Sequence, residues 1–264
     1  MSPARPLAEL ARLGQRLDGV FVFDVHQHLG AWHPFHIPAP GVDDALAAMD
    51  RIGIDLAASS GLPAVLGPDT RAGNDLVIDA VRRHPTRFVG YIAVNPNDPG
   101  DVAAEVERCA AAGLRAVKVH SFHGKSYDCA RYREVYAIAD ARGWPVLAHT
   151  WGGEELADID KLAGEYPNVK WILAHAGTSN REGYINLARR RDHVWLDTCG
   201  SACAWDLVES LVRGAGPDKV LFGTDMTFLA GSQQVGKILL ARISDADKER
   251  ILGTTARTVF ALDA

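Results

Sequence analysis

Short apolar runs rich in β-branched and aromatic residues recur along the chain, and longer stretches separate them. These runs predict eight strands, at residues 20–26, 54–60, 88–94, 114–120, 145–150, 169–175, 193–198 and 219–225. Nearly every position within a run is apolar, which is typical of parallel strands covered on both faces. The pattern therefore predicts a parallel sheet and not a one-sided antiparallel sheet.

Stretches with helical periodicity lie between the predicted strands. They cover residues 43–53, 74–85, 101–113, 130–143, 155–167, 180–190 and 204–216. Most of them end at Gly or Pro, the usual stop signals of helices. Alternating strands and helices imply parallel pairing through right-handed crossovers, and an unbroken series of units favours an α/β fold of the (β/α)8 (TIM) barrel type. An open doubly wound sheet is the alternative, although neither GxGxxG nor GxxxxGK(S/T) follows a strand.

The two ends of the chain extend the barrel pattern. Leu7, Leu10, Leu13 and Leu17 recur at helical spacing and predict a short N-terminal helix packed on the body, in preference to a membrane anchor. A helix is also expected at the C-terminal end. The 264 residues match the length of about 250 that such a barrel needs, and no linker or low-complexity tract divides them, so residues 1–264 are predicted to form a single domain.

Composition narrows the classes of partner. A formal net charge of -5 gives no reason to expect nucleic acid or an anionic membrane surface. No apolar run reaches the ~18 residues of a spanning helix, and the N-terminal segment lacks the apolar core of a secretory signal. The cysteines, Cys109, Cys129, Cys199 and Cys203, form no CxxC pair and are expected to be reduced thiols. We expect a cytoplasmic protein that acts on a small molecule; the oligomeric state stays open, with a homodimer as one option.

Polar residues with chemical potential gather where the predicted strands end. They are Asp24, His26 and His28 after the first strand, Lys118 and His120 after the fourth, and then His149, His175 and Asp225. Each of them alone has a structural explanation, such as a buried hydrogen-bonded histidine or a capping aspartate. In a barrel, however, these strand ends converge on one face, where active sites form. Their joint placement therefore favours one common site.

The spacing of two of these histidines suits a metal ion. His26 and His28 alternate along a strand, so their imidazoles point the same way and can grip one ion. His149 and Asp225 would complete the ligand set from other parts of the ring. Three nitrogen ligands, one oxygen ligand and an open position suit Zn²⁺ best, while Mn²⁺ and Fe²⁺ stay possible.

The order of these motifs resembles a known family. DVHQH, VKVH, LAHT, LAHAG, FGTD and ILGTTARTVFAL, in this order between about residues 20 and 262, resemble the amidohydrolase-2 branch of the amidohydrolase superfamily. The resemblance implies a (β/α)8 barrel with one divalent metal held by His26, His28, His149 and Asp225. It also implies that His175 faces the metal-bound water or the substrate. The chain departs from the family at Thr254, where Asn is usual, and at Met226 and Thr227, where a Pro often stands.

The resemblance suggests hydrolysis of an amide, ester or lactone by metal-bound hydroxide. Asp225 would act as general base and then acid, and His175 would orient the water. The alternative is non-oxidative decarboxylation of an aromatic or unsaturated acid, which members of the same branch carry out on the same metal set. Some of those lyases have Glu in place of the first His, so the presence of His26 favours the hydrolase. A metal-free lactonase and a non-catalytic metal-binding protein are the remaining options.

Further residues are candidates for the substrate or a second metal. Lys118, on the same strand face as His120, is expected to pair with Asp24 or to grip a substrate carboxylate; the alternative, taken from binuclear relatives, is a carbamylated lysine that bridges two metals. Substrate contacts are predicted for Trp32, His33 and His36 in the first loop and for His123 and Tyr127 in the fourth, with rigid or solvated loops as the alternative.

Overall fold

Eight parallel strands form the centre of the computed structural model, which describes residues 6–15, 17, 19–34, 36–201 and 204–262. The strands are β1 (Phe23–Leu29), β2 (Leu56–Gly61), β3 (Phe88–Ala93), β4 (Ala116–Val119), β5 (Pro145–Ala148), β6 (Lys170–Leu173), β7 (Val194–Asp197) and β8 (Val220–Leu221). They pair in chain order, each parallel to the next. All eight predicted strands are therefore confirmed, although β1 starts later than predicted and continues through His28.

Backbone hydrogen bonds bring the two ends of the sheet together. The N–H of Val25 donates to the carbonyl of Phe222 at 3.0 Å, and the N–H of Asp225 donates to the carbonyl of His26 at 2.8 Å. An isolated parallel bridge also joins Gln27 to Met226. The sheet thus forms a nearly closed barrel, as the alternating pattern predicts.

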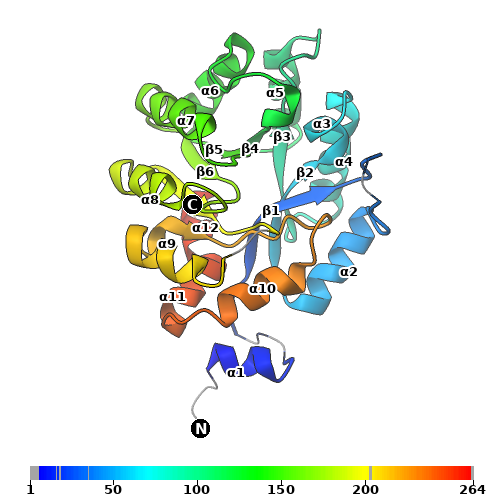
Figure 1. The fold of residues 1–264 in the computed structure, drawn as a ribbon. Coiled ribbons are helices and arrows are strands. Elements are labelled where there is room, and N and C mark those ends of the chain that lie inside the picture. Colours follow the sequence, from blue (N-terminus) through cyan, green and yellow to red (C-terminus); the bar gives the residue numbers. More distant parts are fainter. Residues whose placement is uncertain (1–5, 16, 18, 35, 202–203, 263–264) are drawn as a thin grey trace.

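Helices surround the barrel (Figure 1). They are α1 (Leu7–Arg12), α2 (Val42–Ile52), α3 (Leu62–Val65), α4 (Thr70–Arg83), α5 (Val102–Ala111), α6 (Ala130–Arg142), α7 (Glu154–Glu165), α8 (Arg181–Arg190), α9 (Leu207–Ala215), α10 (Gly231–Leu239), α11 (Asp245–Glu249) and α12 (Thr255–Val259). The seven predicted helices are present. The sequence pattern missed α10, because Gly231 and Gly236 lower the helical propensity of that segment.

The predicted N-terminal helix is present as α1 but ends at Arg12, so Leu13 and Leu17 lie beyond it and Leu13 is exposed. Leu7 and Leu17 are buried, and the N–H of Leu7 donates to a carboxylate oxygen of Asp245 at the start of α11. Helix α1 lies below the barrel in Figure 1, next to α10. Helices α11 and α12 close the chain. None of the helices in the described ranges has the length and apolar character needed to cross a bilayer.

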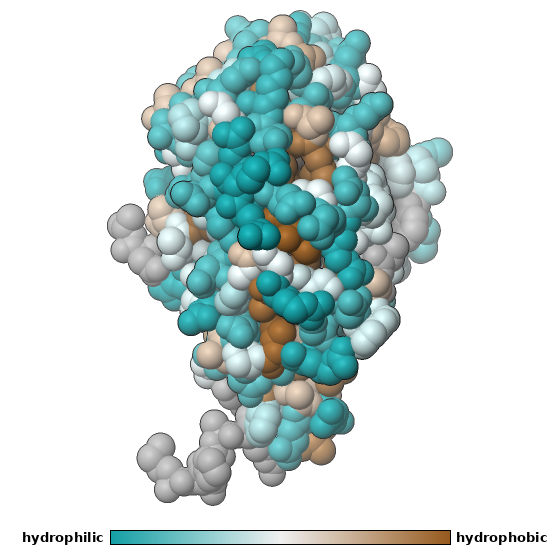
Figure 2. Space-filling model, turned by 60° about the vertical axis from the view of Figure 1, so that its left-hand side comes forward, coloured by the Kyte–Doolittle hydropathy of each residue, from teal (hydrophilic) through white to brown (hydrophobic). Residues whose placement is uncertain are grey.

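Two apolar layers position the polar residues of the barrel. One lies between strands and helices, and the other fills the barrel interior around Tyr91, Leu147 and Ile172. Ala116 belongs to the interior layer, so strand alternation also directs Lys118 inward. Outside, polar residues cover most of the face shown in Figure 2, and apolar residues show mainly in narrow hollows between them. The polar residues inside the barrel are therefore exceptions that need a chemical reason.

Candidate metal and substrate site

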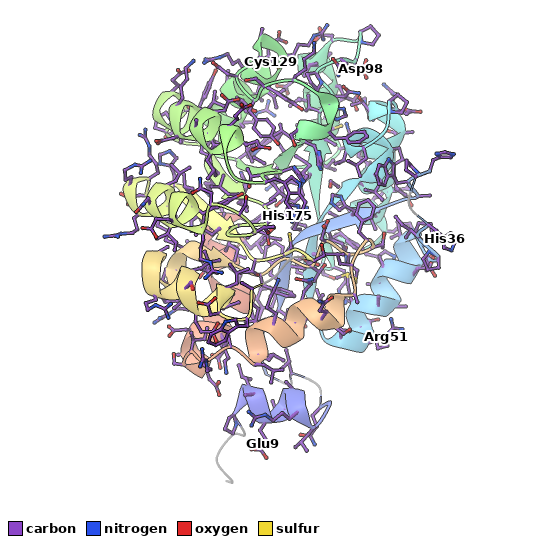
Figure 3. The ribbon with its side chains drawn as sticks, in the orientation of Figure 1. Glu9, His36, Arg51, Asp98, Cys129 and His175 are labelled. Carbon is purple, nitrogen blue, oxygen red and sulfur yellow. The ribbon has the colours of Figure 1, made fainter. Side chains whose placement is uncertain are left out.

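A cavity of about 430 Å³ opens at the carboxyl ends of the strands. Its lining residues are His26, His28, Trp32, Leu66, His120, Ser121, Phe122, His149, Trp151, His175, Gly200, Ser201, Asp225, Phe228 and Leu229. Figure 3 places His175 at the centre of this end of the barrel. The volume lies within the range of small-molecule sites. All the predicted metal ligands line this one cavity.

The two histidines of β1 face each other across its floor. Their Nε2 atoms lie 3.2 Å apart, as alternation along the strand predicts. The His26 Nδ1–H donates to Asp197 Oδ2 at 2.8 Å, so we assign the lone pair of this imidazole to Nε2. The His28 Nδ1 lies 2.9 Å from the Ser60 hydroxyl. Because a hydroxyl can accept a hydrogen bond from Nδ1–H, the lone pair of His28 can lie on Nε2, where it can bind a cation.

Asp225 completes a tight triad with these histidines. Its Oδ1 lies 3.1 Å from His28 Nε2 and 3.7 Å from His26 Nε2, and the three ligand atoms lie within 4.8 Å of one another. Its backbone adopts a left-handed conformation with φ of 58°. The hydrogen bond to the His26 carbonyl helps to hold this conformation.

The protonation states of the triad suit a cation. Burial lowers the pKa of His26 and of His28, which keeps both imidazoles neutral. Burial alone would raise the pKa of Asp225, but the hydrogen bond from His28 and the neighbouring histidines hold it below its usual value. Neutral imidazoles and an ionised carboxylate are the forms that bind metal. The residues present therefore fit a divalent ion.

His149 lies on another side of the same cavity. It follows β5, its Nδ1 lies 3.0 Å from the Ser121 hydroxyl, and its ring stacks on His120 with centroids 3.8 Å apart. Burial lowers the pKa of His149 to about 2. It belongs to neither of the close donor clusters among the described residues. Its role as a fourth ligand stays a prediction.

The second donor cluster combines His26, His175 and Cys199. The Cys199 Sγ lies 3.0 Å from His26 Nδ1, 3.2 Å from His175 Nδ1 and 2.9 Å from Asp197 Oδ2. Sequence reasoning missed Asp197 and treated Cys199 only as a thiol. The position of Asp197 at the end of a predicted strand was the available signal. Cys203 lies outside the described residues.

Lys118 contacts a metal ligand. Its Nζ lies 3.0 Å from His26 Nε2, and burial lowers its pKa to about 8. Asp24 instead accepts hydrogen bonds from the hydroxyl and N–H of Thr224 and from the N–H of His26. The structure therefore pairs Lys118 with His26 and not with Asp24, because the Asp24 carboxylate already anchors the segment after β8 to β1. His120 lines the cavity, and its Nδ1 accepts from the N–H of Phe122.

Of the predicted substrate residues, Trp32 alone lines the cavity within the described chain. Its indole donates to the carbonyl of Leu66 at 3.2 Å, and its ring meets Phe122 and Phe228 edge to face. His33 and His36 are exposed side chains outside the lining. Figure 3 shows His36 at the outer edge of the molecule, away from His175. The proline-rich first loop carries these two histidines outward.

The fourth loop also differs from the prediction. Tyr127 is fully buried, and its hydroxyl donates to the backbone carbonyl of His149 at 2.5 Å. Tyr127 therefore contacts the backbone of a predicted ligand and lies outside the cavity lining. His123 lies outside the cavity lining, with a buried Nε2 that has no hydrogen-bond partner. Its backbone carbonyl accepts from Asn97 of the preceding loop.

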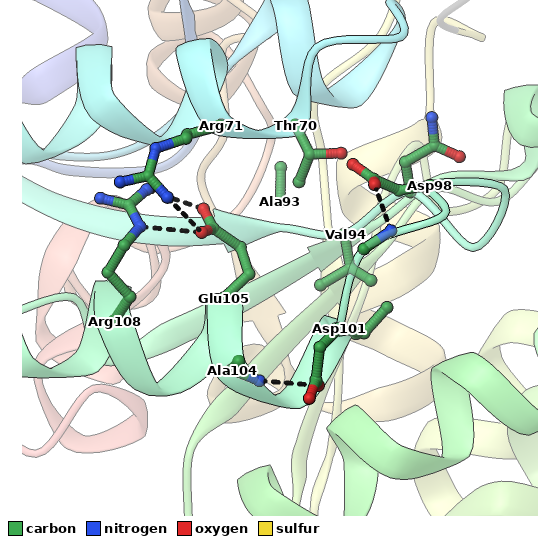
Figure 4. A pocket seen from close by; sticks show the side chains of 12 residues that line it. Thr70, Arg71, Ala93, Val94, Asp98, Asp101, Ala104, Glu105 and Arg108 are labelled. Atoms are coloured by element: carbon green, nitrogen blue, oxygen red, sulfur yellow. Dashed lines mark hydrogen bonds and ion pairs between the residues drawn. The ribbon is translucent and has the colours of Figure 1, made fainter.

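A second hollow of about 420 Å³ lies beside α4 and α5 (Figure 4). Its charged groups satisfy one another, because Glu105 accepts from Arg108 and from Asn74. Thr70 and Asp98 also line it. Neither metal-donor cluster of the described chain lies here. The histidine-rich cavity is therefore the candidate active site.

Gly223 permits the approach of β8 to the site. A Cβ at this position would collide with the Asp197 carboxylate and would lie 2.9 Å from the Cβ of His26. We predict that Gly223→Ala lowers stability by ~1–3 kcal/mol through overpacking and weakens metal binding by displacing His26. Thermal unfolding and metal content measure both effects. Gly236→Ala is the control, since a Cβ there meets nothing within 4 Å; equal behaviour of the two variants would contradict the prediction.

Barrel, cavity and donor set together define an enzyme of the metal-binding (β/α)8 class. Comparison with known proteins agrees: the sequence profile of the family described as Amidohydrolase matches residues 23–262. The chain therefore belongs to the amidohydrolase family, as its motifs suggest.

Three similar proteins have names that state an activity. The γ-resorcylate decarboxylase of Polaromonas sp. (strain JS666 / ATCC BAA-500) is 26% identical over 286 residues, covering 84% of this chain and 87% of that protein. The structure of a 2,6-dihydroxybenzoate decarboxylase complexed with 2,6-dihydroxybenzoate has a TM-score of 0.72 at 19% identity, covering 94% of this chain and 100% of that one. A dihydroxybenzoic acid decarboxylase from Polaromonas sp. JS666, with bound manganese and 2-nitroresorcinol, has a TM-score of 0.72 at 20% identity, covering 93% and 98%. The structural similarities establish the shared fold.

Proposed function

We propose that the chain is a metal-dependent, non-oxidative decarboxylase of a hydroxylated aromatic carboxylic acid. The predicted hydrolase activity is wrong: the named relatives in Polaromonas and in Rhodococcus jostii are γ-resorcylate decarboxylases. The presence of His26 was a poor discriminator, because a ligand set selects a metal and not a reaction. The observation that carries the proposal is an aromatic-walled cavity above the His26, His28 and Asp225 triad.

Four aromatic side chains form the walls of this cavity: Trp32, Phe122, Trp151 and Phe228. Phe228 packs on His28 with ring centroids 5.6 Å apart, and Trp151 stacks on His175 with centroids 5.2 Å apart and planes at 17°. Phe122 and Trp151 are 57% and 48% exposed, so they present apolar ring surface to a ligand in the cavity. These surfaces suit a flat aromatic ring.

The charges of the cavity orient such a ring. Its described lining contains neither Lys nor Arg. A substrate carboxylate therefore finds positive charge only at the end where a bound ion would lie. The aromatic walls then surround the rest of the ring and exclude water.

His26, His28 and Asp225, with His149 as the proposed fourth ligand, would hold a divalent ion that supplies positive charge for the substrate carboxylate. Asp225 takes a proton from solvent and delivers it to the ring carbon that bears the carboxylate. The bond between that carbon and the carboxyl carbon breaks, its electron pair returns to the ring, and CO₂ leaves. One proton is consumed for each CO₂ released, and His175 faces the reacting end of the substrate.

We propose that each chain binds one ion. Nitrogen donors favour zinc, whereas the Polaromonas enzyme structure holds manganese. Metal analysis of the purified protein, followed by reconstitution of the metal-free protein with Mn²⁺ or Zn²⁺, identifies the ion that supports turnover. Two ions per chain would instead favour a carbamylated Lys118 bridge. The homodimer and the cytoplasmic location stay predictions.

Product analysis tests the reaction directly. The metal-loaded protein is incubated with 2,6-dihydroxybenzoate, and both CO₂ and 1,3-dihydroxybenzene are measured. We expect the two products in equal amounts. Hydrolysis of a parallel panel of lactones, esters and amides without CO₂ release from any hydroxybenzoate would contradict the proposal.

The absence of a second cation in the described cavity lining predicts selectivity among acids. We expect kcat/KM for 2,6-dihydroxybenzoate to exceed that for 2-hydroxyisophthalate at least about tenfold, because burying an unpaired carboxylate costs more than ~1.4 kcal/mol. Phe122→Arg adds a cation at the rim and should reduce the difference in kcat/KM between the two acids. Phe122→Leu is the matched control. Equal kcat/KM for the two acids with the unmodified enzyme would contradict the prediction that the cavity offers no second cation.

A further inference from the structure

Cys199 lies directly after β7, beneath the floor of the cavity. It is 2% exposed, so the sulfur is shielded from solvent. Its Sγ lies 2.9 Å from Asp197 Oδ2 and 3.2 Å from His175 Nδ1. The thiol thus sits between a buried carboxylate and a histidine of the site.

One arrangement of protons accounts for these contacts. Asp197 Oδ1 accepts the backbone N–H of Cys199 at 2.9 Å, and Oδ2 accepts the His26 Nδ1–H at 2.8 Å. The short contact between Sγ and Oδ2 is attractive if the S–H donates to the carboxylate. The sulfur then offers lone pairs to His175, which matches an imidazole with its hydrogen on Nδ1 and its lone pair on Nε2.

Other contacts hold the His175 ring in this place. The indole of Trp151 stacks on it, with ring centroids 5.2 Å apart. The backbone of His175 is left-handed, with φ of 57°. A neutral, oriented imidazole has a defined donor side and a defined acceptor side.

We propose that Cys199 is a positioning residue that, together with Asp197, fixes His175 in its Nδ1–H tautomer, so that Nε2 presents a hydrogen-bond acceptor to the substrate. Asp197 then orients two imidazoles, His26 directly and His175 through the thiol. This role rests on the proposed function and narrows the class of substrate. An acceptor next to the carboxylate end selects a substrate with a hydroxyl group beside its carboxylate, because the hydroxyl donates to Nε2 whereas a bare ring carbon leaves it unpaired.

The tautomer can be observed without any activity. Nitrogen-15 NMR of the full-length, histidine-labelled protein, free of metal and loaded with Zn²⁺, reports which ring nitrogen carries hydrogen, and His175→Gln assigns the signal. We expect the Nδ1–H form in the unmodified protein and in Cys199→Ser, whose hydroxyl can donate and accept in the same way. Cys199→Ala should show a mixture of tautomers. An Nε2–H form in the unmodified protein, or an unchanged spectrum in Cys199→Ala, would overturn the proposal.

Kinetics provide a second readout with 2,6-dihydroxybenzoate as probe. Cys199→Ala should lower kcat by about 10–100-fold, as loss of a group that orients a site residue does, and Cys199→Ser should restore most of it. Cys109→Ala removes another buried thiol, which contacts Glu105 far from the triad, and should leave kcat unchanged. Equal kcat for Cys199→Ala and Cys109→Ala would overturn the role in turnover. If no variant decarboxylates the probe but the NMR result holds, the proposed function fails and the tautomer assignment stands.

Discussion

Replacing Asp225 by Asn is expected to lower kcat by about 10²–10⁴-fold, the usual contribution of proton transfer by a positioned group. Asparagine keeps the shape of the side chain but can neither carry the proton nor supply the negative charge that His28 meets at 3.1 Å. It also offers the bound cation a neutral oxygen, so metal content should fall. Release of CO₂ from 2,6-dihydroxybenzoate and elemental analysis of the purified variant measure the two effects.

Asp218→Asn is the matched control. Its carboxylate is 76% exposed and makes only a loose ion pair with Arg250 at 3.6 Å, so this variant should keep full turnover. Far-UV circular dichroism and the thermal midpoint should show that Asp225→Asn remains folded. Turnover of Asp225→Asn within twofold of the control would remove Asp225 from the mechanism.

Removal of the metal is expected to have the second large effect: loss of turnover, together with a lower thermal midpoint. Without an ion, the ligand atoms are held only by weaker contacts: Lys118 donates to His26 Nε2, and His28 Nε2 contacts the Asp225 carboxylate. An ion present at about 100 times its Kd stabilises the folded state by ~2.7 kcal/mol. For a chain of this size, that corresponds to a midpoint shift of about 5–10 °C. Chelation followed by dialysis, and then readdition of Mn²⁺ or Zn²⁺, tests both effects.

His28→Ala provides the control for this shift. It removes one member of the triad, so added metal should raise its midpoint much less than that of the unmodified protein. His84→Ala, at the end of α4 near Asp43 and outside the cavity lining, should keep the full shift. Full turnover by a protein shown to contain almost no metal would rule out the metal-dependent mechanism.

The reaction is the part that the ligand motif could not determine. His26, His28, His149 and Asp225 were found by their order along the chain, but the same donors serve hydrolysis and decarboxylation alike. What separates the two is the surface above the ion. The aromatic walls come from four different loops, and of their residues the sequence had indicated only Trp32.

Loop residues were the least predictable part of the site. His33 and His36 stand near Trp32 in the sequence, yet they point to solvent, and Tyr127 turns inward to the carbonyl of His149. A strand fixes the direction of alternate side chains, whereas a loop has no such period. Composition alone therefore identified loops of the right chemistry without identifying the residues that reach the cavity.

The sequence by itself determined the barrel and the facing pair of His26 and His28, because strand alternation and the convergence of parallel strand ends are local rules repeated along the chain. Only the tertiary structure decided what surrounds that pair. Asp197 and Cys199 at the end of β7 and Lys118 of β4 meet at His26 of β1, although these segments lie far apart in the chain. Such contacts depend on barrel closure and on side-chain packing between distant segments, and no periodicity in the sequence encodes them.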